Sequence, residues 1–195
     1  MEDKKLFIPV LLGTIRKGRE SEKVAKYLVK RAKARADTTP KLFDPRKFKF
    51  PTNDYGEAVK GKFPEYRKAI LKADGVIIVA PEYNHGYPGP LKSMLDTLLR
   101  EYIHRPVAFC GVSSGGFGGV RVIENLLPIV RELGMQATFT DLNVSHVQDV
   151  FNSKGIPKDK AVFDKRIDRM LDELIWMAKT LRWGRENVPS QYHKK

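Results

Sequence analysis

The sequence is poor in the features that mark several classes of protein. Its 195 residues include one cysteine, Cys110, so no disulfide can form within the chain, as is typical of proteins in a reducing cytoplasm. No apolar run approaches the roughly 18 residues that a membrane-spanning helix needs, and residues 1–5 lack the apolar segment of a signal peptide. Spacings typical of a Ser-His-Asp triad, a Cys-His pair or a zinc site are also missing. We therefore expect a cytoplasmic protein with no membrane partner and no bound metal.

Positive charge, in contrast, is in excess. The chain has 36 Lys and Arg residues against 23 Asp and Glu residues, a net charge of +13. Nucleic-acid binding is the obvious interpretation, because Lys and Arg neutralise phosphates. The basic residues are spread along the chain, however, and those in residues 21–35 fall largely on the outer face of a predicted helix. Without a helix-turn-helix, zinc or RRM signature, nucleic acid is disfavoured as the main partner. A positive field also speeds the capture of a small anionic ligand.

Apolar runs alternate with amphipathic segments, which is the pattern of a parallel sheet with helical crossovers. Pro9 is unusual inside a strand, and Pro128 is expected to kink a helix or shift its start. Residues 50–61 contain Pro, Asn and Gly and are expected to form a loop. The pattern predicts one α/β domain over residues 1–195, with a mobile tail at 187–195 and a five-stranded parallel sheet of order 2-1-3-4-5. The predicted strands are residues 6–12, 41–44, 75–80, 106–111 and 136–144, and the predicted helices are residues 21–35, 64–73, 91–101, 119–134 and 158–183.

Three unusual loops follow the first, third and fourth predicted strands. Because the carboxyl ends of parallel strands meet at one edge of a sheet, we expect these loops to share one ligand site. Residues 13–21 read Gly-Thr-Ile-Arg-Lys-Gly-Arg-Glu-Ser, residues 81–92 read Pro-Glu-Tyr-Asn-His-Gly-Tyr-Pro-Gly-Pro-Leu-Lys, and residues 113–119 read Ser-Ser-Gly-Gly-Phe-Gly-Gly.

The three motifs together resemble those of the NADPH-dependent FMN reductases, a flavodoxin-like family that includes quinone, azo-dye and chromate reductases. The resemblance runs from about residue 6 to about residue 150. It implies a flavodoxin-like three-layer sandwich with helices on both faces of the sheet, a bound FMN, and a homodimer or homotetramer. One departure is that Ser93 and Asp96-Thr97 stand where family members commonly have Asn and Asp-Trp. The subunit interface and the substrate pocket are therefore left open.

The first loop offers groups that bind a phosphate. The hydroxyls of Thr14 and Ser21, the guanidinium of Arg16 and the free N–H groups of a helix start can all donate to an anion. The glycine spacing is close to that of a Walker A loop, but Arg19 replaces its Lys and a glutamate replaces its Ser/Thr. Hydrolysis of a nucleoside triphosphate is therefore not expected. The alternative for this loop is a solvated turn in which Ser21 caps the helix.

The resemblance implies that residues 81–84 of the second loop contact the flavin. Asn84 suits a ribityl or phosphate contact, and Glu82 is expected to be ion-paired or capping rather than an acid catalyst. His85 reaches the pyrimidine edge of the flavin in one interpretation and is simply exposed in the other. The four glycines of residues 115–119 allow the backbone to approach an aromatic ring or to bind through N–H groups, with a flexible hinge as the alternative.

With this resemblance, we predict an FMN-dependent oxidoreductase that takes a hydride from NADPH or NADH and reduces flavin, quinone, azo or similar small-molecule acceptors. The flavin carries the chemistry, so no side chain is predicted to be catalytic. The alternatives are a non-enzymatic flavodoxin-like electron carrier, which the basic chain disfavours, and a flavin-less nucleic-acid-binding or regulatory relative. The residues predicted to bind the cofactor are Gly13, Thr14, Arg16, Arg19, Ser21, Pro81, Glu82, Tyr83, Asn84, His85, Ser113, Ser114, Gly115, Gly116 and Gly119.

Overall fold

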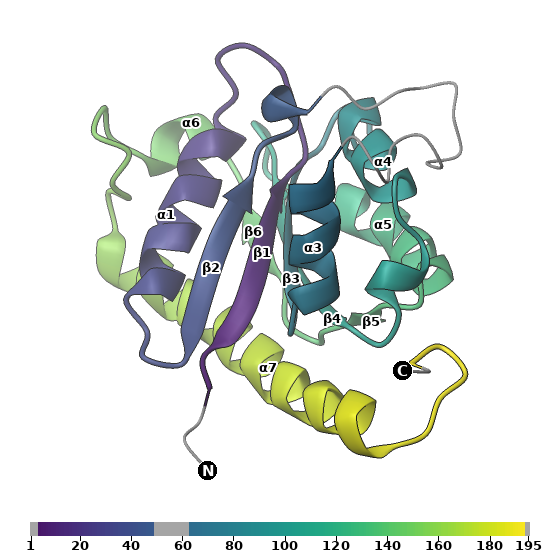
Figure 1. Cartoon of the computed structure of the whole chain (residues 1–195). Helices are drawn as coiled ribbons and strands as arrows, with labels where there is room; N and C mark the ends of the chain where they lie inside the picture. The colour runs from purple at the N-terminus through teal and green to yellow at the C-terminus, as the bar shows by residue number, and fades with distance from the viewer. Residues whose placement is uncertain (1–3, 49–62, 194–195) are drawn as a thin grey trace.

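A parallel sheet forms the centre of the molecule in the computed structural model, which describes residues 4–48 and 63–193 (Figure 1). The strands follow the order β2-β1-β3-β4-β5, and β6 also pairs with β4. All of these pairs are parallel. The predicted strand order 2-1-3-4-5 is therefore confirmed. The strands are β1 (Leu6–Leu12), β2 (Thr38–Phe43), β3 (Val76–Pro81), β4 (Pro106–Val112), β5 (Gln136–Ala137) and β6 (Leu142–Val144).

Helices cover both faces of the sheet and give the molecule three layers (Figure 1). One face packs against α1 (Ser21–Lys33) and α7 (Lys160–Asn187). The other face packs against α3 (Pro64–Lys72), α4 (Gly89–Asp96) and α5 (Val120–Glu132). Between these elements lie the short helix α6 (Val147–Val150) and the 3₁₀ turns η1 (Pro45–Lys47) and η2 (Arg100–Tyr102).

The central strands are apolar along their whole length because both of their faces are covered. Every residue of β3 and of β4 is buried. A half-solvated strand would alternate apolar and polar residues, whereas these two read Val-Ile-Ile-Val-Ala-Pro and Pro-Val-Ala-Phe-Cys-Gly-Val. The helices supply the matching apolar stripes, so the core consists of one layer of side chains on each face of the sheet.

The prolines that looked unusual in the sequence fall where a lost N–H is tolerated. The ladder between β1 and β3 begins only at Val10, and the N–H of Phe7 donates instead to the carboxylate of Asp74 at 2.8 Å. Pro9 therefore lies before the paired stretch on that side. Pro128 lies inside α5, where it has no N–H to donate to the carbonyl of Glu124. Both residues are exposed, so water can bind this carbonyl instead.

Several predicted boundaries were wrong. The predicted strand 136–144 is two short strands, because the chain leaves the ladder between them and exposes 87% of Phe139. The predicted helix 91–101 ends at Asp96, where the hydroxyl of Thr97 donates to the carbonyl of Met94 at 2.8 Å. The last helix begins at Lys160, capped by the side chain of Asp159, and continues to Asn187. The predicted loop 50–61 lies outside the described residues, and the mobility of residues 187–195 stays a prediction.

Among the residues that the structure describes, no helix combines the length and the apolar character needed to cross a bilayer.

Candidate active site

The loops that follow β1, β3 and β4 meet at the carboxyl edge of the sheet, as the strand order requires, and enclose a cleft of about 540 Å³. We call it the carboxyl-edge cleft. Its volume lies in the range of pockets that hold a cofactor or a small substrate. The lining residues are Arg16, Gly18, Arg19, Glu20, Ser21, Pro81, Glu82, Tyr83, Asn84, Val112, Ser113, Ser114, Val147 and Gln148.

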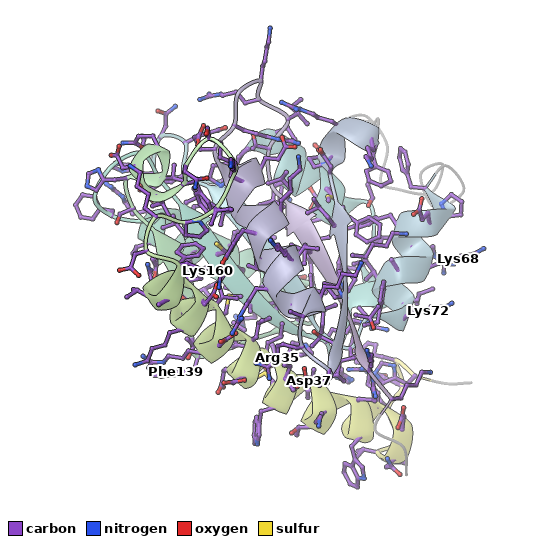
Figure 2. The ribbon with its side chains drawn as sticks, turned by 90° about the vertical axis from the view of Figure 1, so that its left-hand side faces the viewer. Arg35, Asp37, Lys68, Lys72, Phe139 and Lys160 are labelled. Carbon is purple, nitrogen blue, oxygen red and sulfur yellow. The ribbon has the colours of Figure 1, made fainter. Side chains whose placement is uncertain are left out.

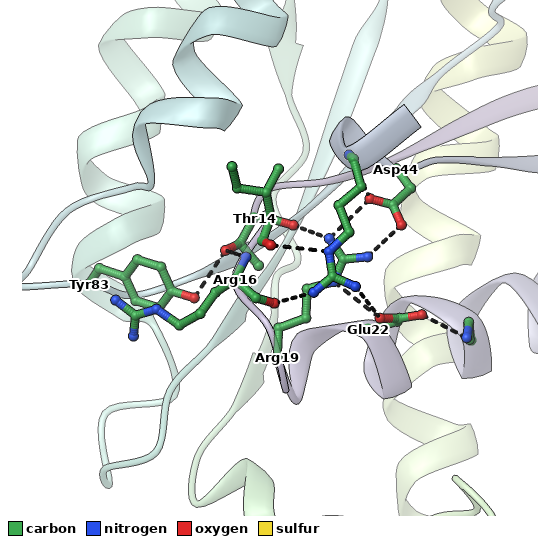
Figure 3. Close-up of polar contacts among 9 residues, drawn as sticks. Thr14, Arg16, Arg19, Glu22, Asp44 and Tyr83 are labelled. Atoms are coloured by element: carbon green, nitrogen blue, oxygen red, sulfur yellow. Dashed lines mark hydrogen bonds and ion pairs between the residues drawn. The ribbon is translucent and has the colours of Figure 1, made fainter. Parts of the chain in front are cut away.

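Thr14 and Tyr83 tie the first loop to the second. Thr14 is buried, and its hydroxyl oxygen accepts a hydrogen bond from the N–H of Arg16 at 3.2 Å. A second hydrogen bond of 3.0 Å joins this hydroxyl to the phenol of Tyr83 (Figure 3). Thr14 itself does not line the cleft, so it orders the loop, and Tyr83 presents its ring to the cleft.

Arg16 lies on this aromatic ring. Its guanidinium carbon is 4.0 Å from the centre of the Tyr83 ring, a distance typical of a cation–π contact. The backbone carbonyl of Arg16 accepts a hydrogen bond from Arg46, which holds the loop in place. In the described part of the chain the guanidinium of Arg16 has no ion pair and no hydrogen-bond acceptor. Its donors therefore remain available to an anion in the cleft.

Arg19 differs from Arg16, although both were predicted to bind the cofactor. Its side chain is 1% exposed and donates to both carboxylate oxygens of Asp44, to Glu22 at 3.1 Å and to the carbonyl of Thr14 (Figure 3). Burial raises the pKa of Asp44, but the hydrogen bonds from Arg19 and from the N–H of Arg46 outweigh it, so the pKa lies below its usual value. The donors of Arg19 are committed inside the protein. Arg19 therefore holds the first loop in place, and its contact with the cofactor, whose predicted cleft it lines, stays a prediction.

Ser21 is the first residue of α1, and its hydroxyl is buried with no hydrogen-bond partner among the described residues. The alternative that Ser21 caps the helix is wrong, because the cap position belongs to Glu20, which makes no capping hydrogen bond with its side chain. A buried hydroxyl without a partner costs free energy unless a ligand satisfies it. The N–H groups of Glu22 and Lys23, in the first turn of α1, donate to the carbonyls of Arg19 and Glu20 at 3.3 and 3.0 Å. The hydroxyl of Ser21 and the guanidinium of Arg16 both line the cleft and are able to donate to an anion there.

The second loop forms a tight turn. The N–H of Tyr83 donates to the carbonyl of Gly86 at 2.9 Å, and the N–H of Gly86 donates back to Tyr83 at 3.0 Å. Asn84 and His85 occupy the turn with φ angles of 50° and 66°, the left-handed region that Asn tolerates better than most residues. The side chain of Asn84 lines the cleft, whereas that of His85 does not.

Arg121, at the start of α5, joins the second and third loops and was missed by sequence reasoning. Its Nε lies 2.9 Å from Glu82 Oε1, and its guanidinium donates to His85 Nε2 at 2.7 Å. Glu82 is thus ion-paired, which agrees with the structural role expected for it, and its second oxygen, Oε2, is buried without a hydrogen-bond partner in the described residues. A single basic residue in a helix gives no local sequence signal, so only the fold reveals this contact.

One glycine of the third loop, Gly119, is required by the packing of the backbone. Gly119 has a φ of 79°, and a Cβ there would lie 2.5 Å from the N atom of Val112 in β4. Gly119 therefore allows α5 to begin directly against the sheet, and it does not line the cleft. Ser113 and Ser114 do line it, and Gln148 of α6 donates to the carbonyl of Ser114 at 3.2 Å.

The structure brings most of the predicted residues together. Those that line the cleft are Arg16, Arg19, Ser21, Pro81, Glu82, Tyr83, Asn84, Ser113 and Ser114. Those that lie outside its lining are Gly13, Thr14, His85, Gly115, Gly116 and Gly119. Val147 and Gln148 complete the wall without any prediction, because they come from α6, a four-residue helix with no motif in the sequence.

Comparisons with known proteins find relatives of this chain. A family model described as NADPH-dependent FMN reductase matches residues 7–149. The quinone reductase of Escherichia coli (strain K12) is 35% identical over 136 residues, which cover 65% of this chain and 70% of that protein. The NADPH azoreductase of Bacillus sp. (strain OY1-2) is 31% identical over 120 residues, which cover 60% of this chain and 64% of that protein, slightly less than two thirds of its length.

Solved structures show the same fold. The structure of FerB, a flavoenzyme NAD(P)H:(acceptor) oxidoreductase from Paracoccus denitrificans, has a TM-score of 0.75 and 20% sequence identity. The superposition covers 89% of this chain and 98% of that one. At this identity the likeness concerns the fold, and it confirms the flavodoxin-like arrangement predicted from the sequence.

Proposed function

We propose, because this chain belongs to the NADPH-dependent FMN reductase family, that it binds FMN in the carboxyl-edge cleft and passes electrons from NADPH or NADH to small-molecule acceptors. The family membership confirms the resemblance predicted from the three loop motifs. Its relatives include proteins named quinone reductase, NADPH azoreductase and 2-hydroxy-1,4-benzoquinone reductase. We therefore propose quinones and azo compounds as the acceptor classes.

The buried hydroxyl of Ser21 is the observation that carries this proposal. It has no partner among the described residues and lines, at the start of α1, the same cleft as Arg16, whose guanidinium has no acceptor among those residues. Such a set of donors fits the terminal phosphate of FMN, since a phosphate accepts several charge-assisted hydrogen bonds at once. The residues present therefore fit the cofactor that the family implies.

The rest of the cleft suits a flat ring. Tyr83 offers an aromatic surface whose phenol is already bonded to Thr14, and the turn that begins at Tyr83 holds Asn84 in a defined place. Bound FMN supplies the hydride and electron transfer chemistry. The protein binds the phosphate and orients the ring. Glu82 also lines the cleft, and its Oε2 atom is buried without a hydrogen-bond partner among the described residues. Burial raises the pKa of the Cys110 thiol well above its usual range, so this cysteine is no nucleophile.

We further propose a homodimer or homotetramer located in the cytoplasm. The apolar side chains of α4, such as Leu91 and Met94, are buried in the protein's own core, so this face of α4 does not supply a subunit interface. Two exposed apolar side chains are candidates for an interface instead: Leu99 follows α4 and is 56% exposed, and Phe117 of the third loop is 66% exposed. Light scattering that gives the mass of a monomer at micromolar concentration would contradict this part of the proposal.

The visible absorption spectrum of the purified protein tests the function. We expect a flavin spectrum, either as isolated or after addition of FMN, that bleaches under anaerobic conditions when NADPH or NADH is added and returns when a quinone is added. The Arg16→Ala variant should take up less FMN under the same conditions. A protein that binds no FMN at any concentration would instead be a flavin-less relative, and one that binds FMN but is not reduced by either nucleotide would be an electron carrier.

A further inference from the structure

A second hollow, of about 780 Å³, lies at the opposite edge of the sheet, where β1 and β3 begin. Its walls come from α3, from the residues that precede β1, and from the last turns of α7. We call it the amino-edge hollow. Seven basic residues and three acidic residues line it, so its charge is strongly positive. The family's cleft is at the carboxyl edge, and this hollow shares none of its lining residues.

Two of the three acidic residues of the hollow, Glu65 and Asp74, are already engaged with basic residues. Glu65 pairs with Lys41 at 2.5 Å. Asp74 accepts hydrogen bonds from Arg182 at 2.7 and 2.5 Å and from the N–H of Phe7 at 2.8 Å. Arg185 lies 3.7 Å from the same carboxylate. One buried carboxylate thus serves two guanidinium groups.

A third guanidinium, that of Arg105, lies behind this pair. It is buried, and within the described part of the chain its acceptors are the backbone carbonyls of Ala73, Ile103 and Leu71, at 2.6 to 3.1 Å. Burial, together with the charge of Arg185, lowers the pKa of Arg105 to about 10, and burial also lowers the pKa of Arg185. Among the residues that the structure describes, positive charges at this edge therefore outnumber carboxylates, and an anion there would be stabilised.

Four lysines at the mouth of the hollow add to this excess. Lys68 and Lys72 lie one turn apart on α3 and point outward from it (Figure 2), and Lys4 and Lys5 precede β1. None of the four makes an ion pair with a residue that the structure describes. Lys72, in the last turn of α3, also interacts favourably with the helix dipole, but this does not account for the other three.

We propose that the amino-edge hollow binds a small molecule that carries two or more linked phosphate groups. Lysine ammonium groups are compact donors that bind phosphate as point charges, and several are placed around one hollow. Phe7, Ala69 and Leu71 give the hollow an apolar floor on which an organic part of the ligand can rest. The basic side chains surround a hollow instead of following a long stripe, which favours a compact ligand over a nucleic acid.

Calorimetric titration of the full-length protein, saturated with FMN, with inorganic tripolyphosphate tests the site. FMN keeps the phosphate donors of the carboxyl-edge cleft occupied, and its spectrum should not change during the titration. We expect saturable binding to one site at about 0.1 M salt, where distant charges are screened. The double variant Lys68→Glu/Lys72→Glu should weaken binding about tenfold or more, because two charge-assisted contacts are lost. Lys68→Gln/Lys72→Gln, which adds no repulsion, should weaken it in the same direction.

The matched control is the double variant Lys30→Glu/Arg131→Glu. Lys30 and Arg131 are exposed, lie in the last turns of α1 and α5, and do not line the hollow, so the change in net charge is the same. Affinity for tripolyphosphate should stay within about twofold in this control, as expected for distant surface charges. Equal losses in the control and in the α3 variants would overturn the proposal, because binding would then follow net charge alone.

Two further titrations separate the sources of phosphate. Vesicles of phosphatidylcholine and phosphatidylserine present phosphates at a surface, and a single-stranded oligonucleotide presents them along a chain. If either one binds through Lys68 and Lys72 while tripolyphosphate does not, the surface docks a macromolecule and the proposed small-molecule site is wrong. Because the α3 variants leave Arg16 and Ser21 intact, FMN binding and NADPH oxidation should be unchanged in them.

Discussion

The guanidinium of Arg16 rests on the ring of Tyr83, with 4.0 Å between the guanidinium carbon and the ring centre. The two residues come from different loops, and the hydrogen bond between Tyr83 and Thr14 fixes their relative position. A cation held in this way loses little conformational freedom when a ligand arrives, which favours tight binding. Among the described residues the N–H donors of the Arg16 guanidinium have no acceptor, so they remain available to a phosphate in the cleft.

Replacing Arg16 with Ala should weaken FMN binding by about 1.5–3 kcal/mol, the range for a hydrogen bond to a charged group. Titration of the apoprotein with FMN, followed by flavin fluorescence, measures the change. Lys17→Ala is the matched control, because Lys17 is an exposed neighbour of the same charge that does not line the cleft. An unchanged dissociation constant in Arg16→Ala would mean that the phosphate is held by other groups.

Replacing Ser21 with Ala should separate cofactor binding from stability. Its hydroxyl is buried without a partner in the described residues, so its removal should leave the melting temperature of the FMN-free protein unchanged or slightly higher. FMN binding should weaken by about 1 kcal/mol, the contribution of one hydrogen bond. Thermal melts without and with FMN measure both effects. A lower melting temperature without FMN would show that the hydroxyl stabilises the fold itself.

The sequence was sufficient to predict the elements that its patterns define. The apolar run of β3 and the long apolar stripe of α7 appear where they were predicted, because burial on two faces or along one stripe imposes a composition that is visible locally. The division of residues 136–144 into β5 and β6 was not predictable in this way, since it depends on which residues of β4 pair with this segment. The positions of the three loops were predicted because strand order and parallel pairing bring their ends together.

The roles of individual loop residues were less predictable. Arg16 and Arg19 look alike in the sequence, but only Arg19 has a carboxylate within reach, and Asp44 comes from the end of β2. Gly119 looks like a residue that makes room for a ligand, and it makes room for β4 instead. Arg121 reaches Glu82 across the gap between α5 and the second loop. The contacts of Arg19 and Arg121 join residues far apart in the chain, and the approach of Gly119 to β4 depends on how the third loop folds back, so local sequence carries no sign of them.

The buried pair of Arg19 and Asp44 predicts a stability effect and its pH dependence. Arg19→Met should lower the free energy of unfolding by about 3 kcal/mol, because Asp44 is left without its main partner in a largely buried position. The pKa of Asp44 is lowered in the folded protein, so its contribution is complete above the pKa of an unfolded Asp, about 4, and is lost as the pH falls through the lowered value. Urea unfolding at neutral pH and below pH 4 measures both.

Two variants control this experiment. Asp44→Asn should reduce the loss of unfolding free energy between neutral pH and pH 4 as much as Arg19→Met does, since it removes the titrating group. Arg100→Met should leave stability within about 0.5 kcal/mol, because Arg100 is exposed and its side chain has no recorded partner in the described residues. If Arg19→Met matches this control at neutral pH, the ion pair does not stabilise the first loop.

Steady-state kinetics should follow a ping-pong pattern. The carboxyl-edge cleft has a volume of about 540 Å³ and is walled by all three loops, so the nicotinamide and the acceptor must use the same open side of the flavin in turn. Oxidised nucleotide then leaves before a quinone or azo compound binds, and double-reciprocal plots at several acceptor concentrations should be parallel. Product inhibition by NADP⁺ should be competitive with the acceptor.

His85→Asn, which keeps a residue that tolerates the left-handed turn, should alter kcat/KM for the acceptor while FMN affinity stays within about twofold, because His85 lies outside the cleft lining and contacts Arg121. Plots that intersect to the left of the axis would require both substrates to be bound together, and a loss of FMN in His85→Asn would make this side chain part of the cofactor site.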